Sequence, residues 1–369
     1  MTSLVKSLGL GFVILAAVPI SASGTVRQNH AQKPAVHKTP VSRHAAPAPT
    51  SLSDRIKALG SVFDGIVGIA VKSIDEGWET GWKDNELYPQ QSVSKLWVSI
   101  TALDAVDRNR VSLDDKVTLT TADLTLFHQP IADEVLKGGS YTTNLEDLLE
   151  RAITTSDNTA NDKLMRSVGG PAAVRAMISR KHLGAIRFAN GERALQSRIA
   201  GVTWSQDYSI GGKFFEVRDA LPVAVRSAAF NRYIASPYDG AAPSAIVNAL
   251  SKLKRGELLS AASTAHLLDI MSHTHTGPNR LKGGLEPGWT LSHKTGTGQE
   301  LAGVQAGYND IGILTAPDGR SYAVAVMIKK TSTPLPVRMT MMNNVVQAVI
   351  DEHDRASDKS TASTPRQSF

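Results

Sequence analysis

The pattern of apolar and polar positions changes twice along the chain. Residues 65–74 are rich in β-branched side chains, and residues 75–77 supply a turn before residues 80–83, so together they predict a β-hairpin. Comparable strand patterns return only near the C-terminal end. We predict these late strands at residues 290–295, 304–314 and 322–328.

Helical periodicity dominates between these strands. Residues 93–106 place Leu96, Trp97, Ile100 and Leu103 at the spacing of a buried helix. Further helices are predicted at residues 145–155, 159–167, 172–179, 245–253 and 339–350. This order predicts an α/β part (51–114 and 275–354) interrupted by an all-α part (115–274). The cleft between two such parts is the usual place for a site.

The two ends of the chain lack this periodicity. Residues 1–23 show a basic start, an apolar run and small residues, the order of a secretory signal peptide. A membrane anchor is the alternative, but the apolar run at 8–20 is shorter than the ~20 residues that span a bilayer. Residues 24–50 are predicted to be a disordered Ala/Pro-rich spacer and residues 355–369 a disordered tail. We therefore expect an exported protein, periplasmic or secreted, without a stable membrane partner.

Composition excludes several classes of function. The chain contains no cysteine, which rules out a cysteine nucleophile, thiolate metal ligands and disulfides. Its formal net charge of +6 arises in the flanks, because residues 1–50 carry five basic side chains without an acid and the tail from Arg355 carries a net +2. About −1 remains for residues 51–354, whereas nucleic-acid binders concentrate positive charge in the folded domain. We expect no nucleic-acid partner.

Histidine spacing does not favour a metal site. His273 and His275 form the only close pair, and no third ligand follows at metal-binding spacing. We expect no metal and no other cofactor.

Ser92 and Lys95 lie three residues apart at the start of a predicted helix, where they share one face. A serine hydroxyl becomes an effective nucleophile when a neighbouring base takes its proton. A helix N-terminus also offers backbone N–H groups to a developing oxyanion. The spacing alone is weak, because it recurs at Ser3/Lys6 in the predicted signal peptide and at Ser251/Lys254 on a predicted surface helix.

Two further tripeptides strengthen the interpretation of Ser92 and Lys95 as a catalytic pair. Ser156-Asp157-Asn158 lies between two predicted helices, and Lys294-Thr295-Gly296 ends a predicted strand. Each has a purely structural alternative, a helix N-cap for the first and a glycine turn for the second. In this order, and after Ser92 and Lys95, they form the set typical of class A β-lactamases and penicillin-binding proteins.

From about Ser51 to His353 the chain resembles class A serine β-lactamases. The resemblance implies an antiparallel sheet flanked by helices, an inserted all-α subdomain, and an active site in the cleft between them. It implies that Ser92 is acylated while Lys95 and Ser156 shuttle protons, and that Glu192 activates the deacylating water. The substrate would be contacted by the following residues: Asn158, Gln196, Lys294, Thr295, Gly296 and Thr297.

Two more positions are open to alternative readings. Arg280 matches an arginine that some members use as an additional carboxylate clamp, and the alternative is a solvated surface arginine. His128 falls where the family often has an aromatic residue at the cleft mouth, so a substrate contact is expected there. The backbone N–H groups of Ser92 and Thr297 would form the oxyanion hole.

The stretch around Glu192 departs from the family pattern in three places. Gln196 replaces an asparagine that helps to hold the water, and Arg193 replaces a proline. Asp162 replaces an asparagine that normally hydrogen-bonds the glutamate, and a second acid there is expected to repel Glu192. The alternative is that Glu192 is a plain loop carboxylate.

Residues 197–242 are longer than the corresponding family loop and hold much of the aromatic content of the chain. Such density predicts a packed subdomain over the site rather than a loose insertion. The aromatic residues are Trp204, Tyr208, Phe214, Phe215, Phe230, Tyr233 and Tyr238.

These observations predict a monomeric hydrolase that opens β-lactam rings through an acyl-enzyme at Ser92. One alternative is a D,D-peptidase or transpeptidase of the penicillin-binding type that acts on peptidoglycan. The other is a catalytically silent relative that binds the cell wall. The lactamase differs from both because it requires a competent deacylating base.

Overall fold

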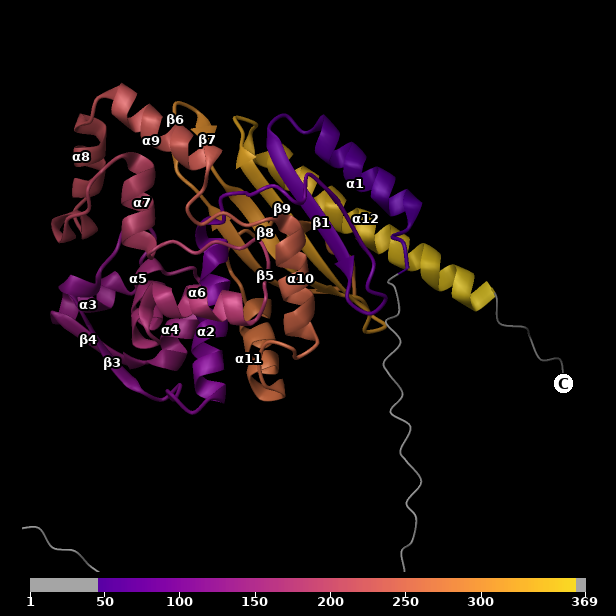
Figure 1. The fold of residues 1–369 in the computed structure, drawn as a ribbon, viewed down its shortest axis with the longest axis horizontal. Helices are drawn as coiled ribbons and strands as arrows, with labels where there is room; N and C mark the ends of the chain where they lie inside the picture. Colours follow the sequence, from indigo (N-terminus) through magenta and orange to yellow (C-terminus); the bar gives the residue numbers. More distant parts are fainter. Residues whose placement is uncertain (1–45, 363–369) are drawn as a thin grey trace, which may run out of the picture. The chain divides into compact units, whose positions relative to one another are not determined.

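A five-stranded antiparallel sheet joins chain segments that are far apart in sequence (Figure 1). The computed structural model describes residues 46–362, with side chains to residue 358. The strand order is β2-β1-β9-β8-β5, and Ala70 of β1 pairs with Ala325 of β9. The strands are β1 (Ile66–Ser73), β2 (Glu79–Trp82), β5 (Thr290–Thr297), β8 (Tyr308–Thr315) and β9 (Ser321–Lys330).

Both faces of the sheet are covered by helices, which explains why its central strands are apolar at nearly every position. Successive side chains of a strand point to opposite faces. In β9, Val324 and Val326 face the cluster that contains α1 (Thr50–Val62) and α12 (Leu335–Ala362). The smaller Ala323 and Ala325 face the other side. There α10 (Pro243–Lys254) and α11 (Ala261–Ser272) pack against the strands.

A helical part lies beside the sheet and centres on α2 (Lys95–Asp107), of which all residues from Lys95 to Ala105 are buried. The short 3-10 helix η1 (Gln91–Ser94) leads into α2. The remaining elements here are β3 (Lys116–Thr120), η2 (Thr121–Asp123), α3 (Ala132–Gly138), β4 (Ser140–Asn144), α4 (Leu145–Thr154), α5 (Asn158–Ser167) and α6 (Gly170–Arg180).

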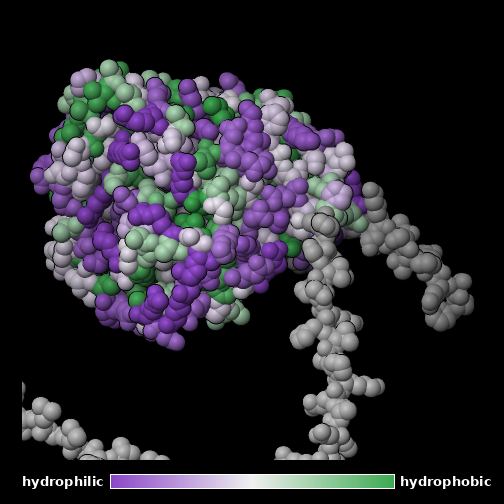
Figure 2. Space-filling view, viewed as in Figure 1, coloured by the Kyte–Doolittle hydropathy of each residue, from purple (hydrophilic) through white to green (hydrophobic). Residues whose placement is uncertain are grey.

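The aromatic-rich stretch 197–242 is folded and packed, as its composition predicts. It continues α7 (Glu192–Ala200) and forms η3 (Gln206–Ser209), α8 (Lys213–Ala220) and α9 (Val223–Ala235). Phe214 and Phe230 are buried. Figure 2 shows apolar side chains on the outer surface over α8 and α9. Exposed apolar residues of this stretch include Ile210, Phe215, Val223 and Val225. We refer to residues 197–242 as the insertion.

Four predictions about the elements need correction. The part predicted as all-α contains the antiparallel pair β3–β4, and its helices α10 and α11 cover the sheet. Ser251 is fully buried, because α10 is packed on the sheet and is not a surface helix. The strand predicted at 304–314 is broken, because Gly307 adopts a positive φ of 91° between β7 (Val304–Gln305) and β8. The β7 segment pairs instead with β6 (Glu300–Leu301).

The fourth correction concerns the predicted disordered tail, which does not begin at residue 355. Helix α12 continues to Ala362, and Arg355 hydrogen-bonds to the carbonyl of Asp351 within it. The side chain of Arg320 also bonds Ser357. The predicted signal peptide, most of the predicted spacer and residues 363–369 lie outside the described residues. Within residues 46–362 no helix is long and apolar enough to cross a bilayer.

Candidate active site

Ser92 and Lys95 come together where η1 passes into α2. Gln91, directly before Ser92, has a positive φ of 55°, which turns the chain sharply into the helix. The Nζ atom of Lys95 lies 2.7 Å from Ser92 Oγ and 2.6 Å from Asn158 Oδ1. The Lys95 side chain is fully buried. The predicted nucleophile and amine are therefore in direct contact.

The Ser156-Asp157-Asn158 tripeptide serves both the helix and the site. Asp157 caps α5 by accepting a hydrogen bond from the Ala160 N–H at 2.9 Å, so the N-cap interpretation holds for this residue. Asn158 Nδ2 donates to the Leu126 carbonyl at 2.8 Å, which orients its Oδ1 toward Lys95. Ser156 has a positive φ of 63°.

Ser156 lies between two amines. Lys294 Nζ is 2.9 Å from Ser156 Oγ, and Lys95 Nζ is 3.4 Å from the same atom. Burial, and then the positive charges of Lys95 and Arg280, hold the pKa of Lys294 well below its ordinary value of 10.5. A hydroxyl between two amines is suited to passing a proton from one partner to another.

Glu192, the first residue of α7, reaches the same amine. Its Oε1 lies 3.0 Å from Lys95 Nζ, and its Oε2 accepts a hydrogen bond of 3.1 Å from Gln196 Nε2. The side chain is buried, with 3% of the residue surface exposed. Glu192 is thus a buried carboxylate in contact with the proposed catalytic lysine, and the interpretation as a plain loop carboxylate does not describe it.

Asp162 binds the backbone of Glu192 rather than its side chain. Both Asp162 carboxylate oxygens accept the Glu192 N–H at 3.1 Å. Burial, and then the charge of Glu192, raise the pKa of Asp162 to about 6. The repulsion expected between the two acids therefore affects the titration of Asp162.

The end of β5 lies against the segment that precedes Ser92. A Cβ atom at Gly296 would lie 2.3 Å from the Gln90 carbonyl oxygen, so only glycine allows this approach. From β8, Asn309 Nδ2 donates to the carbonyls of Pro89 and Gln90 at 2.7 and 3.0 Å. Thr295 is buried and its Oγ1 lies 2.6 Å from Thr276 Oγ1. The side chain of Thr297, by contrast, is exposed.

Arg280 is 7% exposed and is not a solvated surface arginine. Its guanidinium donates to the Asn309 carbonyl at 2.7 Å, to the Gly296 carbonyl at 3.1 Å and to Thr297 Oγ1 at 2.6 Å. The group also stacks 3.8 Å from the centroid of the Tyr308 ring. Arg280 therefore stabilises the edge of the sheet at β5 through these hydrogen bonds and holds the side chain of Thr297 in place.

His128 contributes its backbone to the site, since its carbonyl accepts the Asn158 N–H at 2.9 Å. Its side chain is exposed, which is compatible with a position at the cleft mouth. The neighbouring Phe127 packs edge-on against Phe214 of the insertion, at 5.3 Å between ring centroids. Of the predicted site residues, the structure brings Ser92, Lys95, Ser156, Asn158, Glu192, Gln196 and Lys294 into one connected set.

The arrangement has the parts of a covalent serine hydrolase: a hydroxyl against an amine, a second hydroxyl for proton transfer, and a buried carboxylate. In residues 46–362 no group of three or more His, Cys, Asp or Glu side chains could hold a metal ion.

Comparison with known proteins assigns the family. Residues 51–353 match the model of the "Beta-lactamase enzyme family". The chain belongs to this family. It is 27% identical over 298 residues to the extended-spectrum β-lactamase PER-1 of Pseudomonas aeruginosa, covering 80% of this chain and 85% of that protein.

Solved structures of this family support the same assignment. A β-lactamase from Chitinophaga pinensis superposes with a TM-score of 0.68 at 27% identity, covering 82% of this chain and 99% of that one. An ancestral class A β-lactamase superposes with a TM-score of 0.65 at 25% identity, covering 82% and 99%. The class A β-lactamase fold that the resemblance implies is confirmed.

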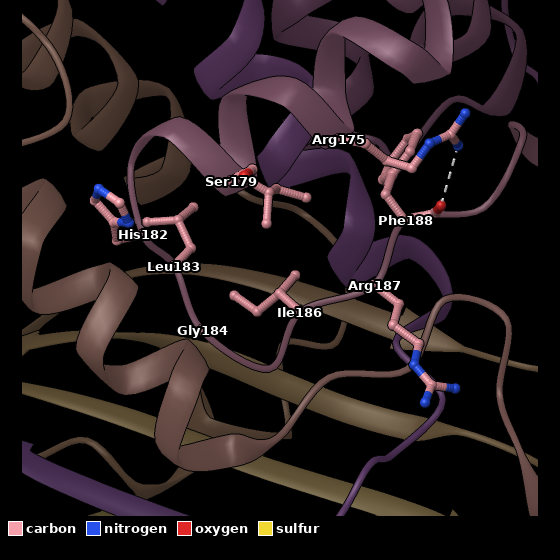
Figure 3. A pocket seen from close by; sticks show the side chains of 9 residues that line it. Arg175, Ser179, His182, Leu183, Gly184, Ile186, Arg187 and Phe188 are labelled. Carbon is pink, nitrogen blue, oxygen red and sulfur yellow. Dashed lines mark hydrogen bonds between the residues drawn. The ribbon is translucent and has the colours of Figure 1, made fainter.

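A separate cavity of about 600 Å³ lies beside α6 (Figure 3). Arg175, His182 and Arg187 contribute polar side chains to it, and Ile178, Leu183 and Ile186 contribute apolar ones. Arg175 donates to the Phe188 carbonyl at 3.3 Å across its rim. None of the predicted site residues lines this cavity, which does not belong to the β-lactamase-like site.

Sequence reasoning missed four residues that hold the site together: Gln91, Tyr233, Asp239 and Gln299. The only signal was the aromatic density of the insertion, which contains Tyr233. Gln299, in the turn between β5 and β6, donates through Nε2 to Gln196 Oε1 of α7 at 3.0 Å, a contact that no motif indicates.

Proposed function

We propose that this protein hydrolyses β-lactam antibiotics through a serine acyl-enzyme at Ser92. The observation that carries the proposal is the position of Lys95 Nζ, which lies 2.7 Å from Ser92 Oγ and 3.0 Å from Glu192 Oε1. The proposed nucleophile Ser92 and the buried carboxylate of Glu192 are thus both in contact with the amine of Lys95. The relatives are β-lactamases and include an extended-spectrum enzyme, which supports the same substrate class.

Acylation uses the first half of this arrangement. Ser92 Oγ attacks the carbonyl carbon of the lactam, and its proton passes to the amine of Lys95. The C–N bond of the ring then breaks while Ser156 Oγ gives a proton to the ring nitrogen, and Lys95 restores the proton of Ser156. The backbone N–H groups of Ser92 and Thr297 would stabilise the oxyanion. Lys294 and Thr295 would bind the substrate carboxylate, and Asn158 its side-chain amide.

Deacylation uses the second half. Glu192, as an ionised carboxylate, takes a proton from a water molecule that attacks the ester carbon. The ester bond to Ser92 Oγ breaks, and Ser92 regains its proton. Gln196 would help to hold the water in place of the asparagine common in the family. A D,D-peptidase that deacylates slowly does not depend on such a base, so the buried position of Glu192 favours the lactamase over that alternative.

The decisive experiment is hydrolysis of a chromogenic cephalosporin by the purified protein, beside Ser92→Ala. We expect turnover by the wild type and a loss on the order of 10⁶-fold in kcat for the variant, as when other serine hydrolases lose their nucleophile. A slow β-lactam should add its mass only to the peptide that contains Ser92. An adduct on Ser251, or turnover by Ser92→Ala, would contradict the assignment.

Export completes the proposal. Residues 1–23 have the order of a signal peptide, and a β-lactamase encounters its substrates outside the cytoplasm. Sequencing the N-terminus of the mature protein from a bacterial host tests this part. Cleavage near Ala22 or Ser23 is expected, and an intact Met1 in the cell envelope fraction would contradict it.

A further inference from the structure

A chain of buried hydrogen bonds connects the insertion to Glu192. Tyr233 is on α9. Its hydroxyl oxygen lies 3.0 Å from Asp239 Oδ1 and 2.6 Å from Gln91 Nε2. Gln91 Oε1 lies 3.0 Å from Gln196 Nε2, which in turn lies 3.1 Å from Glu192 Oε2. All five residues are buried, so water does not compete for these bonds.

The donor and acceptor roles along this chain follow from the Asp239 carboxylate. An ionised carboxylate only accepts hydrogen bonds, and Asp239 also accepts the Gln91 N–H at 2.7 Å. The Tyr233 hydroxyl therefore donates to Asp239, and its oxygen accepts from the Gln91 side-chain NH₂ group. Because the Gln91 NH₂ group faces Tyr233, the side-chain oxygen of Gln91, Oε1, faces Gln196.

The orientation of Gln196 is the consequence. Its NH₂ group must face the Gln91 oxygen, and its second hydrogen then points to Glu192. Its own oxygen is left to accept from Gln299 Nε2 at 3.0 Å. In the flipped orientation the Gln196 oxygen would face the Glu192 carboxylate and repel it.

We propose that Tyr233 is a positioning residue for the deacylation step, acting through Gln91 and Gln196 to hold Glu192 in place. The proposal rests on the proposed function, because Glu192 is the proposed base. The Tyr233 ring is fully buried among Leu195, Ile199 and Phe230, so the packing of α9 on α7 fixes where its hydroxyl lies. The insertion would thus influence the rate of deacylation without contacting the substrate.

The test separates the two half-reactions in Tyr233→Phe, which keeps the ring and removes only the hydroxyl. Stopped-flow mixing with a cephalosporin measures acylation, and mass spectrometry follows the decay of the adduct. We expect deacylation to slow by about 10²-fold, the effect of misplacing a catalytic group by roughly 1 Å, with acylation close to wild type. A general loss of structure would instead lower both rates and the melting temperature.

Tyr238→Phe is the matched control. Its ring lies 5.8 Å from that of Tyr233, and its hydroxyl has no hydrogen-bond partner among the described residues. This variant should deacylate at the wild-type rate. Equal slowing in both variants would mean that packing, and not the hydroxyl, is responsible, and would overturn the proposal.

Gln91→Met interrupts the same chain one residue closer to Gln196 and keeps the proposal testable if Tyr233→Phe folds poorly. If Tyr233 acts through Gln91, the double variant should deacylate no more slowly than Gln91→Met alone. Additive slowing, or wild-type deacylation in either folded single variant, would overturn the proposal. If the wild type neither hydrolyses a β-lactam nor forms an adduct, the proposed function fails first, and this inference fails with it.

Discussion

The two halves of the site are held by different parts of the molecule. Ser92, Lys95 and Lys294 lie on elements of the main core, where Asn309 bonds the segment before Ser92 and Gly296 allows β5 to approach it. Glu192 and Gln196 lie on α7, and their side chains depend on amides and on a tyrosine from the insertion. The proposed acylation machinery is thus built into η1, α2 and the adjoining strand β5, whereas the proposed deacylation machinery depends on contacts from the insertion.

The two steps can therefore be altered separately. A change in the insertion would alter how long the acyl-enzyme lasts, while a change at the β5 edge would alter how readily it forms. The first step defines which molecules acylate Ser92, and the second defines whether the protein acts as a hydrolase or as a trap for β-lactams.

The largest effect on the deacylation half is expected from Glu192→Gln. Removing a general base typically costs ~10²–10⁴-fold, so deacylation should slow by at least that much while acylation stays detectable. Rapid mixing and mass-spectrometric decay of the adduct measure the two steps. Turnover at the wild-type rate would place water activation elsewhere, and a wild-type adduct that lasts for hours would favour the peptidase alternative.

Arg280→Ala should have the next largest effect, and on the other half. The change removes a charged donor to Thr297 Oγ1 and to the carbonyls of Gly296 and Asn309. We expect kcat/KM to fall by about 10- to 150-fold, equivalent to about 1.5–3 kcal/mol, with adduct decay close to wild type.

Arg338→Ala is a useful control for this prediction. Arg338 also lies over the Tyr308 ring, at 5.4 Å from its centroid, but it has no contact with Thr297 among the described residues. Its loss should change the melting temperature more than kcat/KM. An unchanged kcat/KM in Arg280→Ala would show that Arg280 only supports the β5 edge.

Asp162→Asn tests the titration of the buried carboxylate beside the start of α7. It should change the free energy of unfolding more than the rate of turnover. The pKa of Asp162 is raised to about 6, above the ~3.9 of an unfolded chain, so the folded protein binds this proton more tightly. Its contribution to stability is therefore present at low pH and is lost as the pH rises from about 4 through 6.

The asparagine variant keeps an acceptor for the Glu192 N–H without the charge. Relative to wild type, its free energy of unfolding should gain roughly 2 kcal/mol between pH 4 and pH 7. Urea denaturation across this range measures the difference, with the exposed Asp114→Asn as a control that should follow the wild-type profile. Parallel profiles for Asp162→Asn and wild type would contradict the assigned titration.

The smallest effect is expected from Phe215→Ala in the insertion. Phe215 lies 5.7 Å from Phe127, between ring centroids, and is 46% exposed. Loss of this aromatic pair should lower the free energy of unfolding by about 0.5–1.5 kcal/mol. Val223→Ala, at a more exposed position of the same segment, should cost less. A change of acylation rate by more than tenfold would mean that the insertion supports both halves of the site.

The sequence alone predicted the first half of the site better than the second. Ser92 and Lys95 lie one helix turn apart, so their proximity follows from local structure. Ser156 lies 61 positions from Lys95 and was found through its tripeptide motif, not through local geometry. Strand alternation likewise predicted β1, β5 and β9 to within a few residues. Gln91 and Asp239 lie 148 positions apart and meet only in the folded chain, and no local pattern marks them.

Other misses have equally physical causes. The α/β boundary at residue 275 was wrong for α10 and α11, because an amphipathic helix shows that it is buried but not what it packs against. The end of α12 was missed because polar side chains are compatible with a solvated helix as well as with a disordered tail. Arg280 was ambiguous because one arginine in sequence gives no information on burial.

The pairing of β1 with β9 has a consequence for the kinetics of folding. Ala70 and Ala325 are neighbours in the sheet, and α1 lies against α12, where Arg55 pairs with Asp351. The centre of the sheet therefore cannot close until almost the whole chain has left the ribosome, and contacts of such long range slow folding. A chain that completes its sheet this late stays open during synthesis, the state in which an unfolded polypeptide can be threaded across a membrane before it folds.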